Sequence, residues 1–102
     1  MTETVSDWLD RRRPAAPEEL DRRLRPHVAG SAPPLEALVS ATESALGAVL
    51  GAPDSRERAA AYELLAADAL LTYACEAAIE GAHPEAALEG VLEHLGRMGG
   101  EG

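Results

Sequence analysis

Apolar residues recur on almost every side of the segment from Arg56 to Glu80, which we predict to form one long helix. Their spacings of three and four residues define two lines. The first line is Ala60, Leu64, Ala67, Leu71, Ala74 and Ala78, and the second is Ala59, Tyr62, Ala66, Ala69 and Tyr73. At about 100° of rotation per residue, the second line lies well over a quarter turn from the first. A helix with two apolar lines needs a neighbour on each, so we expect other helices to enclose it.

The segments on either side of this helix are amphipathic in the same way. Apolar residues repeat at helical spacing from Leu35 to Val49 and again from Leu88 to Met98. Asp54 or Ser55 is placed to cap the start of the long helix, and Gly81 is placed to end it in a left-handed conformation. Because connections of only a few residues join antiparallel neighbours, the sequence predicts an all-α fold. Its body, residues 35–98, is an antiparallel three-helix arrangement around one long central helix.

A charged N-terminal arm, residues 1–28, precedes this body. Ser6 can cap a short helix that ends before Pro14, and Pro17 suits the first turn of a second short helix that Pro26 stops. The stretch 29–34 is rich in alanine, glycine and proline, which is typical of a linker. The last four residues, 99–102, are expected to be a disordered tail.

The three-helix arrangement does not account for all of the apolar surface. At roughly 1.5 Å per residue the long helix spans about 37 Å, whereas each flanking helix reaches about 22 to 25 Å. Leu65, Cys75 and Ile79 also lie outside both apolar lines. The remaining apolar surface predicts cover from the N-terminal arm, from a second copy or from a different protein.

Composition and charge narrow the class of protein further. The chain carries 18 acidic residues against nine arginines, a net charge of −9, which disfavours a nucleic acid as the main partner. Six of the arginines lie in the arm, where they are interleaved with acids, so we expect the arm to dock on its own body or on an acidic partner. Cys75 is the single cysteine and excludes an internal disulfide. The polar N-terminus and the lack of a membrane span favour a cytoplasmic protein.

Two groups of side chains are candidates for chemistry. Glu80 and His83 form a Glu-x-x-His pair that, with Glu76, is a candidate metal site if two copies meet across a dimer interface. Gly81 and Pro84 bracket the end of the helix, however, so a surface role for His83 is favoured and no cofactor is expected. The acids of the line Asp68, Thr72, Glu76 and Glu80 are best interpreted as the solvated edge of the long helix.

No motif supports an enzyme. The sequence has no glycine-flanked nucleophile, no phosphate-binding glycine loop and no paired-cysteine zinc pattern. The stretch Leu65-Ala66-Ala67-Asp68-Ala69-Leu70-Leu71 is similar to a helical segment of isoprenyl diphosphate synthases. The aspartate-rich magnesium motifs of that family are absent, so the resemblance implies no activity.

We therefore predict a small, non-enzymatic helical interaction module, either a homodimer or a subunit of a larger assembly. The alternative is a metal-binding helical protein that uses Glu76, Glu80 and His83. Trp8 with Leu9 either anchors the arm in a groove of another protein or closes the chain's own core, and closure of the core is favoured. The predicted interaction residues are Trp8, Leu9, Tyr62, Leu65, Leu71, Tyr73 and Ile79.

Overall fold

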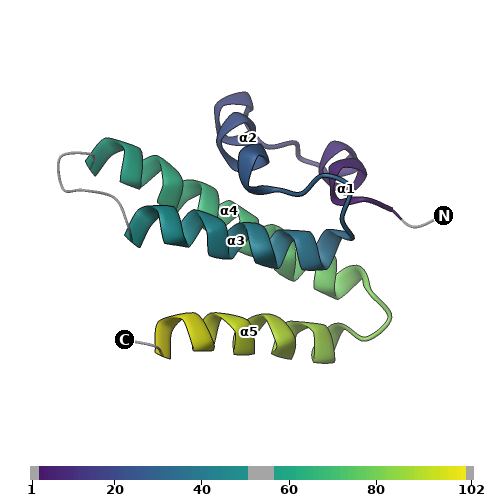
Figure 1. Cartoon of the computed structure of the whole chain (residues 1–102). Coiled ribbons are helices and arrows are strands. Elements are labelled where there is room, and N and C mark those ends of the chain that lie inside the picture. Colours follow the sequence, from purple (N-terminus) through teal and green to yellow (C-terminus); the bar gives the residue numbers. More distant parts are fainter. Residues whose placement is uncertain (1–2, 51–56, 101–102) are drawn as a thin grey trace.

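The computed structural model describes residues 3–50 and 57–100, and helices are the regular elements in these two ranges (Figure 1). The all-α prediction is confirmed. In chain order the elements are α1 (Val5–Arg11), α2 (Glu18–Leu24), a short 3-10 helix η1 (Arg25–His27), α3 (Pro34–Leu50), α4 (Glu57–Glu80) and α5 (Pro84–Gly100).

The helices α3 and α4 form a central antiparallel pair. The short helices α1 and α2 lie along one side of this pair, and α5 runs along the opposite side (Figure 1). The predicted body of three antiparallel helices with a long central one, preceded by a short helical arm, is therefore confirmed. The central helix has 24 residues, and each of its two antiparallel neighbours has 17.

Several helix ends follow the expected local chemistry, and others differ. Thr4, not Ser6, caps α1, because its side-chain oxygen accepts a hydrogen bond from the backbone N–H of Asp7. Glu80 is the last residue of α4, as predicted, but Gly81 is not in the left-handed region. Its N–H instead bonds the carbonyl of Ala78, which closes a tight final turn. The predicted caps Asp54 and Ser55 lie outside the described residues.

Small side chains at the interface let α3 and α4 approach closely. On α3 the buried residues Ala37, Ala41 and Ala45 are 4% exposed or less, and Leu38 is fully buried beside them. The facing part of α4 buries further alanines, and the alanines of both helices belong to one apolar cluster. Because an alanine fills little volume, the fit of this interface depends on the absence of larger side chains.

A larger side chain in this interface should therefore destabilise the protein. We expect Ala41→Leu to lower the free energy of unfolding by about 1–3 kcal/mol, since the added atoms force the two helices apart. Ala48→Leu is the matched control, because Ala48 lies on the same helix and is exposed. Urea unfolding followed by circular dichroism measures both. Equal effects of the two substitutions would contradict close packing at Ala41.

The buried surface of α4 differs from the two separate lines expected from the sequence. Ala67, Ala74 and Ala78 of the first line are buried, and so are Ala66 and Tyr73 of the second. Leu70 belongs to neither line and is 0% exposed. At about 100° per residue it lies between the two lines, so they join into one broad buried face.

The N-terminal arm contributes to the same core. Val5 and Trp8 of α1 and Leu24 of α2 are at most 1% exposed, and they belong to one cluster with Leu38 and Leu70. The backbone N–H of Val5 also bonds the carbonyl of Ala32, in the segment expected to be a linker. The arm thus covers one side of the α3 and α4 pair. The opposite side is left to α5.

Candidate interaction surface

The indole of Trp8 joins the arm to the C-terminal end of α4. Its ring lies 6.0 Å from the ring of Tyr73, centroid to centroid, and its Nε1 donates a hydrogen bond of 2.9 Å to a carboxylate oxygen of Glu80. Arg11 donates a second bond of 2.7 Å to the same oxygen. A buried indole needs an acceptor for its single N–H, and Glu80 supplies it.

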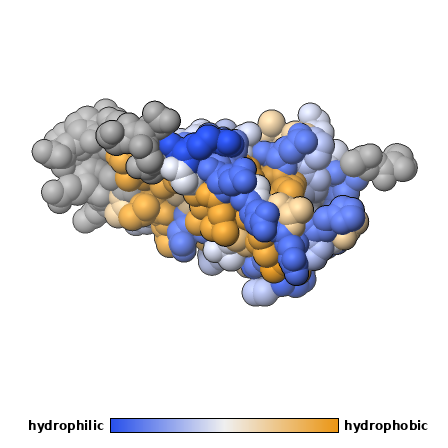
Figure 2. Space-filling model, turned by 90° about the horizontal axis from the view of Figure 1, so that it is seen from below, coloured by the Kyte–Doolittle hydropathy of each residue, from blue (hydrophilic) through white to orange (hydrophobic). Residues whose placement is uncertain are grey.

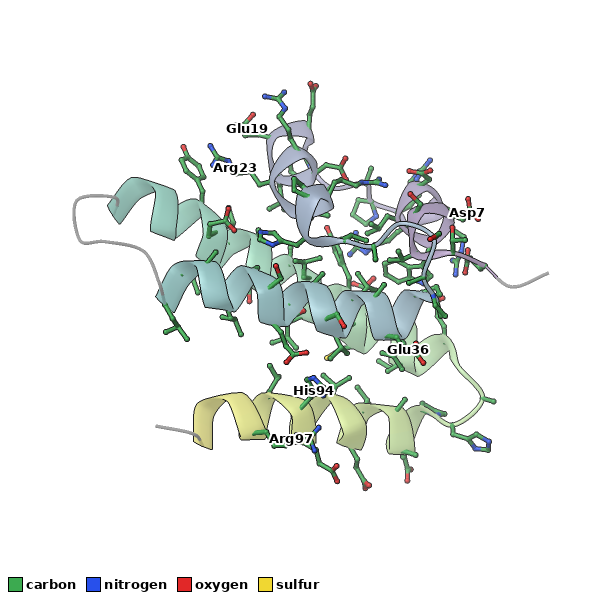
Figure 3. The ribbon with its side chains drawn as sticks, viewed as in Figure 1. Asp7, Glu19, Arg23, Glu36, His94 and Arg97 are labelled. Atoms are coloured by element: carbon green, nitrogen blue, oxygen red, sulfur yellow. The ribbon has the colours of Figure 1, made fainter. Side chains whose placement is uncertain are left out.

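Arginines of the arm bind α4 through both charge and aromatic stacking. Arg12 donates bonds of 2.6 and 2.8 Å to the two carboxylate oxygens of Glu76, and its guanidinium lies 4.2 Å from the ring centre of Tyr73. Arg23 lies 4.4 Å above the ring of Tyr62, near the N-terminal half of α4 (Figure 3). The bond to Glu76 raises the pKa of Arg12. Paired and stacked in this way, these cations hold the arm on its own body.

Most of the arm's positive charge is used inside the chain. Five of its six arginines lie within 4.0 Å of a carboxylate oxygen: Arg11, Arg12, Arg22, Arg23 and Arg25. Arg13 binds the backbone carbonyls of Asp10 and Arg12. The sequence left open whether the arm docks on its own body or on another molecule. In this structure it docks on its own body.

The Glu80 contacts predict a dependence of stability on pH. Hydrogen bonds from Arg11 and then Trp8 lower the pKa of Glu80 below its ordinary value of 4.5. The ionised Glu80 carboxylate therefore contributes its full stabilisation above pH 4.5. This stabilisation is lost as the pH falls through the lower pKa of Glu80 in the folded state. We expect the fall in the urea midpoint between about pH 5 and pH 3 to be shallower in Glu80→Gln than in the parent chain. Glu89→Gln, which removes an exposed acid of α5, is the matched control. Identical slopes for the parent and Glu80→Gln would contradict the assignment.

Two histidines bridge helices. His27 lies with Nδ1 2.8 Å from the hydroxyl of Ser44 and Nε2 2.8 Å from a carboxylate oxygen of Glu63, so it connects η1 to α3 and α4. His94 points from α5 toward α3, where its Nε2 lies 2.6 Å from Glu43 (Figure 3). The side of α5 that carries His94 therefore faces α3.

The residues of the alternative metal site take other roles in this structure. The carboxylates of Glu76 and Glu80 bind Arg12 and Arg11, and His83 is exposed in the turn between α4 and α5. Within residues 3–50 and 57–100, no group of three or more metal-ligating side chains comes together. These contacts favour a role in holding the arm for both carboxylates.

An apolar surface remains open on the side of α4 that faces away from α3. We call it the outer face and define it by three side chains that are 52% to 66% exposed: Leu65 and Ile79 of α4 and Leu92 of α5. Figure 2, which views the molecule from the side of α5, shows apolar areas along the length of the protein with polar residues between them. Large apolar side chains that stay exposed on one side of a protein are candidates for an association site.

Helix geometry places Leu92 on the same side as the α4 residues. Leu92 lies about 160° around α5 from His94, which faces α3, so Leu92 lies on the side away from α3. On α4, Leu71 lines the space between α3, α4 and α5. Leu65 and Ile79 lie about 120° and 80° around α4 from Leu71. These rotations bring Leu65, Ile79 and Leu92 to one side of the α4 and α5 pair, whereas Leu64 lies only about 20° from Leu71.

The interaction residues predicted from the sequence fall into three groups. Trp8, Leu9 and Tyr73 are buried in the core, and Leu71 is half-buried beneath α5. Tyr62 is 39% exposed under Arg23. Only Leu65 and Ile79 belong to the outer face. Sequence reasoning did not single out Leu92, and it assigned Leu64 to a buried line.

Comparisons with protein families, with characterised proteins and with solved structures find no significant match. None of the described helices is both long enough and apolar enough to cross a lipid bilayer.

Proposed function

We propose that the protein is a non-enzymatic helical interaction module that binds another polypeptide through the outer face. The observation that carries this proposal is the exposure of Leu65, Ile79 and Leu92, each of which leaves at least half of its surface in water. Burying such side chains on association is favourable by roughly 25 cal/mol for each Å² of apolar surface removed from water.

The burial pattern of α5 supports the same proposal. Val91 is the one side chain of residues 84–97 that is buried, whereas α3 buries five. Leu88 and Leu95 are half-buried beside Leu92. Because α5 buries so few side chains against α3 and α4, a partner that covers its exposed side would bury further apolar surface.

Affinity purification of the chain from its native cells, beside a Leu65→Asp/Ile79→Asp variant, tests the proposal. We expect sedimentation velocity to find the parent chain in a species heavier than the 10.7 kDa monomer. The variant should be monomeric, because two charges on the outer face oppose burial. Circular dichroism checks that it stays folded. Two identical monomers would contradict the proposal.

A further inference from the structure

The chemistry of the outer face points to one class of partner. We propose that it binds a positively charged amphipathic helix, about four turns long, that belongs to a different protein. This inference rests on the proposed function and specifies the partner of that same surface.

The spacing of residues on α4 matches a helical partner. Leu65, Asp68, Thr72, Cys75 and Ile79 follow spacings of three, four, three and four residues, the rhythm at which one helix packs along another. Each is exposed or half-buried. Leu65 and Ile79 are 14 residues apart, which corresponds to about 21 Å or four helical turns. An amphipathic helix of that length would contact both with its apolar side.

Unpaired negative charge surrounds this line. Asp68 lies within it, and Glu85 and Glu89 lie on α5 within about 20° and 60° of the direction of Leu92. All three are exposed, and none forms an ion pair with another described residue. Arg97 lies about 140° around α5 from Leu92, where it contacts His94. Cations on the partner are therefore the complement that this surface lacks.

Other carboxylates of the body, away from the outer face, have partners within the chain. Glu43 and Glu63 contact histidines, and Glu76 and Glu80 bind arginines of the arm. On the described side chains of α3, α4 and α5, the carboxylates without an ion pair are Glu36, Asp68, Glu85, Glu89 and Glu93. Two of these, Glu85 and Glu89, precede Leu92 on the same side of α5, and Asp68 lies between Leu65 and Ile79. The unpaired charge is thus concentrated where the apolar surface is open.

A second copy fits this surface less well. Two outer faces related by a two-fold axis near Thr72 would place Leu65 of one copy beside Ile79 of the other. The same axis would place each Asp68 beside Cys75 of the other copy, and none of the arginines with a described side chain lies on this side of α4. An unpaired charge buried in this way opposes association, and each copy carries a net charge of −9.

The test uses the full chain and two synthetic 18-residue peptides with identical leucine positions at helical spacing. One peptide has lysines flanking the leucines, and the other has glutamates. We expect fluorescence anisotropy to show binding of the lysine peptide at least tenfold tighter than that of the glutamate peptide, and weaker at high salt. Leu65→Ser/Ile79→Ser should abolish that binding without loss of helicity.

A matched pair of charge variants tests the role of the acids. Asp68→Asn/Glu89→Gln should weaken binding of the lysine peptide about fivefold, as expected for two exposed charges. Asp7→Asn/Glu36→Gln removes the same charge away from the outer face and should leave binding unchanged. Equal effects of the two pairs, or equal binding of the two peptides, would overturn the inference.

Sedimentation velocity of the same samples separates the remaining outcomes. If neither peptide binds and the parent chain forms a dimer that Leu65→Ser/Ile79→Ser dissociates, a second copy occupies the outer face. That result would overturn the inference and leave the proposed function standing. A monomer that binds neither peptide, and that purifies from native cells as a monomer, would overturn both.

Discussion

Replacing Trp8 with alanine is expected to lower the free energy of unfolding by about 3–5 kcal/mol. Trp8 is 1% exposed, and its ring packs beside Tyr73 in the cluster that joins α1 to the central pair. Truncation leaves a cavity at this junction and removes the N–H that bonds Glu80. The substitution removes the only tryptophan of the chain, so circular dichroism and not tryptophan fluorescence must follow unfolding. The loss of stability should appear as a lower urea midpoint.

Trp8→Phe is the matched control for this substitution. Phenylalanine keeps most of the buried ring and lacks the indole N–H, so its effect should be clearly smaller than that of alanine. A cost below about 1 kcal/mol for Trp8→Ala would show that the arm is not part of the core. The arrangement of α1 on the central pair would then be wrong.

Leu70→Ala is expected to lower the free energy of unfolding by about 2–5 kcal/mol. Leu70 is fully buried near the centre of the broad face that α4 presents to its neighbours. Leu65→Ala, five residues earlier on the same helix, makes the same chemical change at a side chain that is 52% exposed. We expect Leu65→Ala to cost under about 1 kcal/mol, because about half of the Leu65 surface is already in water.

Equal costs for Leu65→Ala and Leu70→Ala would contradict the exposure of Leu65. Urea unfolding of the purified chain measures both variants under the same conditions. If Leu65→Ala proves as costly as Leu70→Ala, then Leu65 is buried in solution. The outer face would then be part of the core, with no free surface for a partner.

The helical elements could be predicted from the sequence because their signals are local. Pro34 and Pro84 begin helices, and the apolar spacing on both sides of the central helix predicts its neighbours. The buried side of the central helix was predicted less well. Spacing shows which residues share a side, but it cannot show how far along the helix a neighbour reaches. Leu64 is therefore exposed although it belongs to an apolar line, and Leu70 is buried although it belongs to none.

The contacts that hold the arm could not be predicted, because they join residues far apart in the sequence. Trp8 and Glu80 are 72 positions apart, and Arg12 and Glu76 are 64 apart. The interleaved charges of the arm predict that it docks on its own body or on an acidic partner. They do not show which carboxylate each arginine contacts. The exposure of Leu65 and Ile79 was anticipated in part, since both lay outside the apolar lines. Leu92 could be distinguished from its apolar neighbours only once the side of α5 that faces α3 was known.

Methyl NMR of the purified chain with a soluble paramagnetic agent tests the central claim most directly. The claim is that α1 and α2 close one side of the central pair while the outer face stays open. We expect strong broadening of the methyl signals of Leu65, Ile79 and Leu92, and protection of those of Leu38 and Leu70. Protection of Leu65 and Ile79 as strong as that of Leu38 would contradict the account.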